Sequence, residues 1–451
     1  MKTIFIALLE GVEAKNILRS HVVDELLTSA ETRVVLLLKN KERMAYYQKE
    51  FNHPRLLYQV ICIIPVTGLD RFFSWLKFML LRTKSTDQKR KMNLAEKGNY
   101  LSYYVGIFFN RLLARPFFIR LARRLDYRLV RRSQYRQYFE LFKPDLVFLA
   151  HPFDEPEIHL LREAKRRGVK TVGLINSWDK ATSRAILRLL PDKIIVFNET
   201  VKKEMLRYQA LNTYQVFVSG QPQYDYFFNT ESISRIDFFK KFNFDPAKKL
   251  LVYAPMGNAF SDSDWLTIDL IARLNSEQAF GDKLEILVRF QPNDFVNQDE
   301  LSKRAYFKYQ YPGKRFSTLR GVDWDMDRVE LDELRDTLAN LDILICHASS
   351  LSVDAVCFGK PVINIGYEMT GTRLLSKSPT QYFLNEHYKK ALSTGGIKLV
   401  KTEVELISAV KTYLLDSEID REGRERLLFQ QCQFTDGRSA ARIASYLMSI
   451  I

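Results

Sequence analysis

The sequence contains few of the residues that build disulfides and metal clusters. Its 451 residues include four cysteines and six histidines. Cys62, Cys346, Cys357 and Cys432 are scattered, form no Cys-x-x-Cys pair and share no zinc-type spacing with a histidine. We therefore expect neither disulfides nor a metal site, and a reducing compartment such as the cytoplasm.

Long apolar runs are also absent. No stretch of about 18 apolar residues occurs, so the sequence predicts no membrane-spanning helix. Residues 1–10 have a short apolar core without a small-residue cleavage site, which is typical of a first buried strand and not of a signal peptide. A hydrophobic content of 46% is usual for a soluble globular protein, and the length suggests two large domains.

Acidic residues are scarce in one segment, residues 71–140. There, 17 Lys and Arg face four acids, so the segment carries +13 of the chain's net charge of +15. Four apolar side chains recur at helical spacing in its second half, and four arginines lie roughly opposite them: Phe118, Leu121, Leu125 and Leu129, and Arg120, Arg124, Arg128 and Arg131. Such a helix is suited to lying on an anionic membrane.

Two other interpretations of this segment stay open. The apolar face of the helix could pack on its own domain, which would leave the arginines solvated. Nucleic acid is a less favoured partner, because no recognised RNA- or DNA-binding motif accompanies the charge. The prediction is contact with an anionic membrane surface through residues 68–142.

Strands and helices alternate along the rest of the chain, which predicts parallel sheets covered by helices on both faces. We expect strands near 3–9, 33–38, 57–64, 144–150, 170–175, 192–197 and 216–219, and then near 249–254, 284–288, 341–345 and 361–365. The fold class is α/β, with two Rossmann-like domains. The first covers 1–228 with a basic helical insertion at 68–142, the second covers 229–430, and a helix over 431–451 ends the chain.

The most informative stretch runs from Cys346 to Ile363. An apolar strand precedes it, small residues form a turn, and a helix is expected to start at Ser349 or Ser350 and to end at Gly359. Free backbone N–H groups at such a helix start attract anions. Ser349 and Ser350 could donate to a phosphate, and Asp354 could accept from ribose hydroxyls. The alternative is an ordinary βαβ unit with a serine-rich helix cap.

This stretch resembles the donor-binding half of GT-B-fold glycosyltransferases, with Asp354 where that family usually has Glu. The run Asp342-Ile-Leu-Ile, Ser349-Ser350, Asp354 and Lys360-Pro-Val-Ile is most similar to the branch that contains CDP-glycerol glycerophosphotransferases and related surface-polysaccharide enzymes. Val288–Pro292 resembles the Lys-x-His-Pro element of that branch, although Arg289 and Gln291 occupy its key places. The resemblance implies a nucleotide-activated donor, no cofactor, no bound metal, and a last helix that crosses back to the first domain.

Ligands of open α/β sheets bind beyond the carboxyl ends of the strands. Candidate residues for the donor therefore follow strands of the second domain: Gly257, Asn258, Arg289, His347, Ser349, Ser350 and Asp354. Gly257 would allow close backbone approach to a phosphate, and Arg289 could clamp a diphosphate with two hydrogen bonds.

Candidate residues for the acceptor and for catalysis follow strands of the first domain: Glu10, Gly11, Glu13, His151, Ser177, Trp178 and Asp179. Transfer to a hydroxyl needs a base that takes the hydroxyl proton. His151 and Asp179 are the stronger candidates, and Glu13 and Glu10 the weaker ones. Structural roles are the alternatives: Asp179 could cap the next helix, and His151 could satisfy a backbone carbonyl.

Together these features predict a bacterial, cytoplasmic, metal-independent GT-B-type transferase at the inner face of the plasma membrane. It would move a sugar or polyol phosphate from a nucleotide-activated donor to a glycan or lipid-linked acceptor. A UDP-N-acetylglucosamine 2-epimerase is the enzymatic alternative, although it should lack the basic insertion. A non-catalytic protein that binds a nucleotide sugar or an anionic surface is the other.

Overall fold

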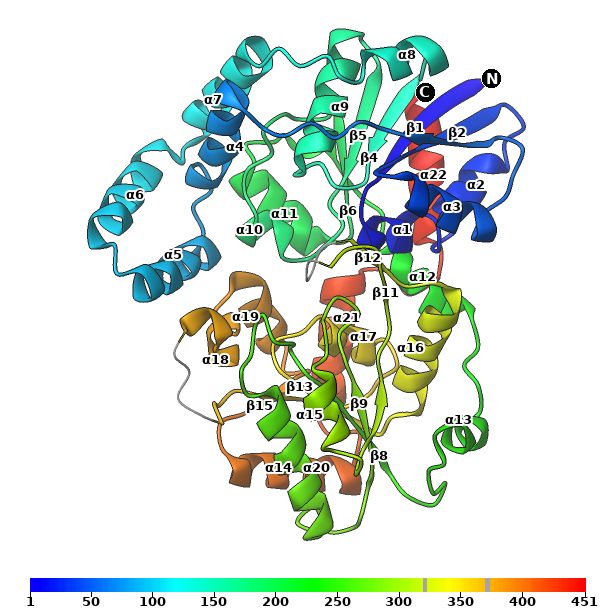
Figure 1. The fold of residues 1–451 in the computed structure, drawn as a ribbon, viewed down its shortest axis with the longest axis vertical. Helices are drawn as coiled ribbons and strands as arrows, with labels where there is room; N and C mark the ends of the chain where they lie inside the picture. Colours follow the sequence, from blue (N-terminus) through cyan, green and yellow to red (C-terminus); the bar gives the residue numbers. More distant parts are fainter. Residues whose placement is uncertain (319–322, 370–373) are drawn as a thin grey trace. The chain divides into compact units, whose positions relative to one another are not determined.

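The computed structural model describes residues 1–318, 323–369 and 374–451. Contacts divide the chain into two units (Figure 1). The first comprises Met1–Asp87, Asn99–Asn229 and Cys432–Ile451, and the second Gln88–Gly98 and Thr230–Gln431. The divisions after Asn229 and Gln431 lie one residue from the boundaries expected from the sequence.

The segment Gln88–Gly98 differs from the expectation, because it belongs to the second unit and not to an insertion confined to the first. Two hydrogen bonds explain this. Gln88 Nε2 donates to Gln381 Oε1 at 2.7 Å, and the backbone N–H of Ser376 donates to Glu96 Oε1 at 2.8 Å.

The first unit is built on a seven-stranded parallel sheet in the order β3-β2-β1-β4-β5-β6-β7. The strands are β1 (Lys2–Leu8), β2 (Thr32–Leu38), β3 (Leu56–Val60), β4 (Leu146–Leu149), β5 (Lys170–Leu174), β6 (Lys193–Val196) and β7 (Val216–Val218). Successive side chains of a strand point to opposite faces. Ile4, Ile6 and Leu8 therefore enter one core, whereas Phe5 and Ala7 enter the other.

Helices cover both faces of this sheet: α1 (Gly11–Ile17), α2 (Val22–Leu27), α3 (Lys41–Glu50), α9 (Glu155–Arg166), α10 (Lys180–Ser183), α11 (Glu199–Tyr208), α12 (Pro222–Asn229) and α22 (Ser439–Ile450). The segment between β1 and β2 forms two helices, α1 and α2, because His21 between them adopts a left-handed conformation with φ 67°. The last helix, α22, packs against α2 in the first unit, as the fold class predicted.

Between β3 and β4 the chain forms five helices: α4 (Gly68–Met79), α5 (Lys84–Lys97), α6 (Tyr100–Leu113), α7 (Pro116–Leu129) and α8 (Arg136–Phe142). Helix α4 contacts α6 and α7. The face of α7 that packs inward carries Ile119, Arg123 and Asp126.

Three of the four residues of the predicted apolar face of α7 point to solvent: Leu121, Leu125 and Leu129, which are 40% to 49% accessible. The fourth, Phe118, is half-buried and packs against a core cluster of the first unit, whereas the neighbouring Phe117 is 67% exposed. Arg120, Arg124, Arg128 and Arg131 are exposed as well. At 3.6 residues per turn the arginines form a stripe beside the apolar one, with the packed face behind both. The alternative in which the apolar face packs on its own domain is therefore wrong for the three leucines and holds for Phe118.

Buried ion pairs connect these helices to the sheet. Arg188, which is buried, contacts Asp70 of α4 at 2.8 Å and Asp126 of α7 at 2.8 Å. Arg162 of α9 contacts Asp126 at 2.6 Å, and His159 Nε2 lies 3.1 Å from Asp70 Oδ2. Helices α4 and α7 are thus held inward by buried charges as well as by apolar residues such as Phe73 and Ile119, while other apolar residues of both helices face outward.

The second unit contains a six-stranded parallel sheet in the order β10-β9-β8-β13-β14-β15, and a two-stranded antiparallel sheet of β11 and β12. The strands are β8 (Leu250–Ala254), β9 (Glu285–Arg289), β10 (Lys308–Gln310), β11 (Lys314–Arg315), β12 (Trp324–Asp325), β13 (Ile343–Cys346), β14 (Val362–Ile365) and β15 (Lys398–Val400). The sequence did not predict the edge strands β10 and β15, which are only three residues long.

The helices of the second unit are α13 (Arg235–Phe242), α14 (Asp264–Ser276), α15 (Gln298–Ser302), α16 (Arg328–Asn340), α17 (Leu351–Val356), α18 (Pro379–Tyr382), α19 (Glu386–Leu392), α20 (Glu403–Leu415) and α21 (Arg421–Cys432). Across the three described stretches of the chain, no helix has both the length and the apolarity that crossing a membrane requires.

Candidate active site

Three loops of the first unit bring polar side chains to one edge of its sheet. They follow β1, β4 and β5, which are neighbours in the sheet. Because the strands are parallel, their carboxyl ends meet at the same edge. The loops carry Glu13, His151 and Asp179, as predicted, together with Asp154 and Lys180.

His151 lies at the centre of this cluster and is 6% exposed. Its backbone N–H donates to Glu157 Oε2 at 2.8 Å, and its Nδ1 lies 3.0 Å from Asp154 Oδ1. Burial and the nearby charge of Lys180 lower the pKa of His151. The imidazole is therefore neutral at pH 7. The contact with Asp154 is close but lacks hydrogen-bond geometry, since Nδ1 has no hydrogen-bond partner among the described residues; a proton on Nδ1 beside this carboxylate would leave the lone pair on Nε2.

Asp154 is the acid in contact with His151. Burial raises the pKa of Asp154, but the contact with His151 and the charges of Lys180 and Arg184 outweigh this effect and lower the pKa to about 2. The carboxylate is thus ionised at neutral pH. A neutral histidine held by an ionised carboxylate is the arrangement that general-base catalysis uses.

Glu13 is a buried acid beside this pair. Its Oε2 accepts the backbone N–H groups of Leu9 and Glu10, the latter at 3.0 Å. Its Oε1 is buried and has no hydrogen-bond partner in the described part of the chain. Burial, followed by the charge of Asp154, raises the pKa of Glu13 to about 8. Glu13 is therefore protonated at neutral pH, which makes Oε1 a hydrogen-bond donor and a poor base.

Replacing Glu13 with Gln is expected to stabilise the first unit at alkaline pH. The folded-state pKa is raised from 4.5 to about 8, so the stability that Glu13 contributes is present below pH 4.5 and is lost as the pH rises through about 8. At 1.36 kcal/mol per pKa unit the gain is at most about 5 kcal/mol. The urea midpoints of wild type and Glu13→Gln should separate between pH 5 and pH 9.

The control for this experiment is Glu42→Gln, which makes the same chemical change at an exposed position of α3. It should shift the midpoint little, and equally at both pH values. A constant difference between wild type and Glu13→Gln across this range would contradict a protonated Glu13.

Asp179 was one of the two stronger candidates for the catalytic base, but its carboxylate already has hydrogen-bond partners within the protein. Its carboxylate accepts the hydroxyl of Ser177 and that of Ser183, the latter at 3.0 Å. It stands at the N-cap position of α10, but its side chain makes no capping hydrogen bond, so the structural role that was the alternative is not seen. Trp178 and Ser177 are half-buried in the same loop.

Lys180 and Asn176 complete this cluster and were not singled out from the sequence. Lys180 Nζ donates to Asn176 Oδ1 at 2.6 Å. Burial lowers the pKa of Lys180, and the charges of Asp179 and Asp154 oppose that effect. The Nδ2 of Asn176 is buried and has no hydrogen-bond partner among the described residues. A substrate oxygen would satisfy it.

Glu10 and Gly11 lie at the start of α1. Glu10 Oε1 lies 3.3 Å from Lys39 Nζ, so its carboxylate is already in an ion pair. One ligand atom each of Glu13, His151 and Asp154 lies within 4.8 Å of the others, which is close enough for a shared metal ion. The neighbouring charge of Lys180 and the protonation of Glu13 both oppose a cation at that point.

The second unit gathers the predicted donor residues at the carboxyl edge of β9, β8 and β13, which are neighbours in its sheet. Gly257 follows β8 with φ 85°, as a tight turn requires. Its N–H donates to Asp264 Oδ2 at 2.6 Å, and the N–H of Asn258 donates to Asp294 Oδ2 at 3.1 Å. These two backbone donors are therefore engaged by carboxylates and do not face an open phosphate site.

Arg289 is buried at the end of β9, with 5% of its surface exposed. Its Nη1 donates to Gln310 Oε1 at 2.5 Å, and the Glu333 carboxylate is 3.9 Å away. Burial lowers the pKa of Arg289 to about 10, although Glu333, Glu330 and Asp354 oppose this. Arg289 was expected to clamp a diphosphate, but one of its guanidinium donors is already used by Gln310.

The helix after β13 is shorter than predicted, since it was expected to end at Gly359. Helix α17 covers only Leu351–Val356, with Ser350 at the N-cap and exposed. The N–H of Ser349 donates to the Tyr388 hydroxyl at 3.2 Å. Ser349 is half-buried, and Asp354 is buried. The hydroxyl of Ser349 accepts the backbone N–H of Leu351 at 3.2 Å, and Ser350 is exposed.

His347 is fully enclosed in this part of the second unit. Its Nδ1 lies 2.9 Å from the carbonyl of Ile365, and its Nε2 is buried without a hydrogen-bond partner in the described stretches. Burial lowers the pKa of His347, with Asp264 opposing it, so the ring is neutral. With Nδ1 protonated toward Ile365, Nε2 can only accept a hydrogen bond.

A family model matches residues 169–449: CDP-glycerol:poly(glycerophosphate) glycerophosphotransferase. The chain belongs to this family. The predicted resemblance is thereby confirmed, as is the class of enzyme, a GT-B-type transferase of cell-surface polymer biosynthesis. No curated protein matches the chain significantly.

Solved structures similar to this glycerophosphotransferase family member share its fold. The S. aureus MnaA–UDP complex has 13% sequence identity and a TM-score of 0.56, and the match covers 100% of this chain and 98% of that one. The UDP-GlcNAc 2-epimerase from Neisseria meningitidis, bound to UDP-GlcNAc, has 14% identity and a TM-score of 0.54, with 100% of both chains covered.

The wall teichoic acid polymerase TagF, soaked with CDPG, has 12% identity and a TM-score of 0.51, and the match covers 99% of this chain and 88% of that one. These likenesses confirm two Rossmann-like domains of the GT-B type. At such low identity they do not separate epimerases from transferases. The family match makes that distinction.

Proposed function

We propose that this enzyme transfers a polyol phosphate, or a sugar, from a nucleotide-activated donor to a hydroxyl of a glycan or lipid-linked acceptor at the cytoplasmic face of the membrane. The observation that carries the proposal is the His151–Asp154 pair at the carboxyl edge of the first sheet, in a chain of the glycerophosphotransferase family. The family favours glycerol phosphate as the transferred group and CDP-glycerol as the donor.

In this proposal His151 Nε2 takes the proton of the acceptor hydroxyl. The hydroxyl oxygen forms a bond to the phosphorus next to the glycerol, and the bond from that phosphorus to CMP breaks. CMP leaves with the electron pair. Protonated Glu13 and Asn176 Nδ2 are buried polar groups beside His151, and they would donate hydrogen bonds to acceptor oxygens.

The donor is proposed to bind the second unit at the carboxyl edge of β8, β9 and β13. The exposed hydroxyl of Ser350 and the half-buried hydroxyl of Ser349 support a phosphate contact there. The unpartnered Nε2 of buried His347 supports an acceptor role toward a donor hydroxyl or amine. We assign Gly257, Asn258 and Arg289 a structural role at this edge and not a direct contact with phosphate, because their hydrogen-bond donors already have protein partners.

The reaction is tested by incubating the full-length protein with CDP-glycerol and a glycerol-phosphate-primed lipid or glycan acceptor. We expect release of CMP that depends on the acceptor, followed by mass spectrometry of the elongated product. A donor at about 100 times its Kd should also stabilise the folded protein by roughly 2.7 kcal/mol.

Two outcomes would contradict the proposal. Conversion of UDP-N-acetylglucosamine to its 2-epimer without an acceptor would favour the epimerase alternative. A thermal shift with nucleotide donors but no turnover of any of them would favour a non-catalytic binding protein.

The membrane location is supported by a continuous run of exposed apolar side chains on three helices. They are Leu69, Phe72, Trp75 and Phe78 on α4; Tyr100, Leu101, Tyr104, Val105, Phe108, Phe109 and Leu112 on α6; and Phe117, Leu121, Leu125 and Leu129 on α7. In Figure 1 these helices lie together on one flank of the first unit. Exposed apolar patches of this extent mark interaction sites, and the adjoining arginines suit an anionic lipid surface.

The double variant Leu121→Ser/Leu125→Ser is expected to weaken binding to anionic phospholipid vesicles by more than tenfold. Burying one leucine in an apolar phase is worth about 1.5–3 kcal/mol, and both side chains are exposed on the protein. Co-sedimentation with vesicles measures the loss. The matched control is Val404→Ser/Leu415→Ser, which alters exposed apolar residues of α20 in the second unit. Equal losses in both variants would contradict docking through α7.

A further inference from the structure

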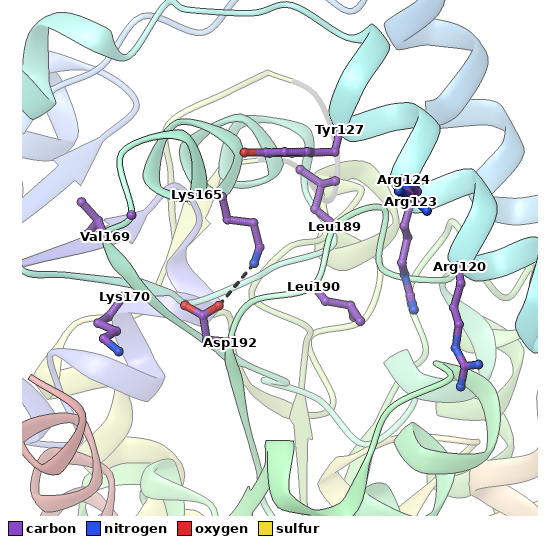
Figure 2. Close-up of a pocket in the computed structure, with 11 residues that line it drawn as sticks. Arg120, Arg123, Arg124, Tyr127, Lys165, Val169, Lys170, Leu189, Leu190 and Asp192 are labelled. Atoms are coloured by element: carbon purple, nitrogen blue, oxygen red, sulfur yellow. Dashed lines mark hydrogen bonds and ion pairs between the residues drawn. The ribbon is translucent and has the colours of Figure 1, made fainter.

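A basic cavity of about 670 Å³ lies in the first unit, between α7, the end of α9 and the start of β5. Its charged lining consists of Arg120, Arg123, Arg124, Lys165, Lys170 and a single acid, Asp192. Figure 2 shows the three arginines on one side of the hollow, with Lys165, Lys170 and Asp192 on the other. Leu189, Leu190 and the ring of Tyr127 lie between them.

Arg123 is a buried cation in this cavity without an acid to balance it. It is 8% exposed, and its donors go to carbonyl oxygens: Nε to Leu187 at 2.9 Å and Nη1 to Gln209 at 2.7 Å. No carboxylate pairs with it among the residues that the structure describes. Burial and the neighbouring charge of Arg120 lower the pKa of Arg123 to about 9. An anion in the cavity would relieve both costs.

The other cations of the cavity are also poorly balanced. Lys165 Nζ lies 3.3 Å from Asp192 Oδ1, an ion pair drawn in Figure 2. Arg120, Arg124 and Lys170 are exposed, and within the described residues no acid forms an ion pair with any of them. Five cations therefore converge on a hollow that holds one acid.

This cavity is separate from the candidate active site. Lys170 begins β5, and Asp192 precedes β6, so the cavity lies at the amino ends of the strands. The His151 cluster lies beyond their carboxyl ends. Five residues of β5 separate the two sites by about 16 Å. A group bound in the cavity does not take part in the transfer.

The surroundings of the cavity identify the kind of anion. Arg120 and Arg124 belong to the arginine stripe of α7, and the neighbouring stripe exposes Phe117, Leu121 and Leu125. Apolar side chains that enter a bilayer from α7 would bring lipid phosphates to the level of these arginines. The apolar floor of Leu189 and Leu190 suits the glycerol part of a lipid better than a fully hydrated polyanion.

We propose that this cavity binds the phosphate-bearing head group of an anionic membrane lipid. The proposal rests on the membrane location proposed above, and it adds a specific head-group site to a non-specific apolar contact. The phosphate would accept hydrogen bonds from Arg120 and Arg124, and the negative charge would compensate Arg123. The lipid then fixes how α7 lies on the membrane.

The test uses the full-length protein, vesicles with and without phosphatidylglycerol, and soluble dihexanoyl phosphatidylglycerol below its micelle concentration. Leu190→Trp fills the cavity without changing charge, and Arg124→Gln removes one exposed cation. Lys203→Gln, at an exposed position of α11, is the charge-matched control. Retained melting temperatures show that each variant folds.

We expect both cavity variants to weaken binding of the soluble lipid at least fivefold. Lys203→Gln should leave this binding unchanged. The magnitude follows from one charge near a lipid surface, which is worth on the order of 1 kcal/mol, or about fivefold in affinity. If Leu190→Trp bound the soluble lipid as tightly as wild type, the proposal would be overturned, because the lipid would then be held by diffuse surface charge and not in the cavity. Displacement of the soluble lipid by free inorganic phosphate alone, or by a short RNA of higher affinity, would overturn it as well.

These outcomes are distinct from failure of the transfer reaction or of membrane docking. Leu121→Ser/Leu125→Ser should lose vesicle binding while still binding the soluble lipid. Release of CMP with a water-soluble acceptor should be the same in wild type, Leu190→Trp and Arg124→Gln.

Discussion

His151→Ala is expected to lower kcat of the transfer reaction by a factor of about 10²–10⁴, the range that a positioned general base contributes. His151 Nδ1 is held 3.0 Å from Asp154 Oδ1, and its pKa is lowered by burial and by Lys180, so the neutral ring is ready to accept a proton. The loss is measured as acceptor-dependent CMP release at saturating CDP-glycerol.

The pH dependence of kcat separates a base from a residue that only holds structure. Neutral His151 is the active form, so the rate falls as the pH falls through its pKa. Because that pKa is lowered from 6.5, the acid limb of the profile should lie below pH 6.5. Asp154→Asn removes the negative charge that favours the protonated ring, so the acid limb should move to lower pH. The variant should also have a lower kcat.

Asp179→Asn is the comparison that tests the assignment. Ser177 and Ser183 already occupy the Asp179 carboxylate, so this variant should keep most of the wild-type kcat. The thermal shift with CDP-glycerol should survive in His151→Ala, because the donor is assigned to the second unit. A His151→Ala enzyme with wild-type kcat, together with an inactive Asp179→Asn enzyme, would reverse the assignment.

The position of the polar cluster around His151 could be predicted from the sequence, because the order of strands and helices could be predicted. Alternating strands and helices predict parallel sheets, and parallel strands bring the loops after β1, β4 and β5 to one edge. Glu13, His151 and Asp179 met there as expected. Asp154 was missed, although its spacing of three residues from His151 at the start of α9 was a usable signal.

The protonation of the cluster was not predictable from the sequence. Glu13 is protonated because it is fully buried beside Asp154, and both conditions depend on packing between distant segments. The same limit applies to the second unit. The N–H of Ser349 is taken by Tyr388, and the N–H of Gly257 is taken by Asp264. A motif shows which backbone groups lie near a turn, but not which side chains from elsewhere have already satisfied them.

The insertion shows how far amphipathic patterns can be interpreted. The sequence correctly predicted a helix in α7 with apolar and arginine faces, but it placed the arginines opposite the apolar side. In the structure both stripes face solvent, because the third face carries Ile119, Arg123 and Asp126 into the protein. Arg123 and Asp126 were indistinguishable from surface charges until their partners Gln209 and Arg188 were known.

Arg188→Met is expected to destabilise the first unit by about 3 kcal/mol, the low end of the cost of breaking a buried ion pair, because Asp126 keeps its contact with Arg162 and Asp70 its contact with His159. Arg188 is buried and lies 2.8 Å from both Asp70 and Asp126, which are buried as well. Its guanidinium also contacts Glu155. Methionine fills a similar volume but leaves these carboxylates without their shared cation. The shift of the urea midpoint, followed by tryptophan fluorescence, measures the loss.

Arg136→Met is the matched control, because Arg136 pairs with Glu140 at 2.7 Å on an exposed face of α8. An exposed pair of this kind contributes little to the free energy of unfolding, because solvent screens the two charges. Equal midpoint shifts in the two variants would show that solvent compensates the buried charges. Loss of the buried cation should also release α4 and α7, so vesicle binding by Arg188→Met should weaken even under conditions where the protein remains folded.

The stability of wild type and of Arg188→Met at acid pH provides a second measurement. Burial raises the pKa of Asp70, but His159 and Arg188 outweigh this and lower it well below 3.8. A depressed carboxyl pKa contributes stability above the unfolded-state pKa, and that stability is lost as the pH falls through the folded-state value. The difference between wild type and Arg188→Met should therefore be full at pH 7 and should narrow as the pH falls below about 3.8. A difference that does not change with pH would assign the loss to packing of the arginine stem and not to its charge.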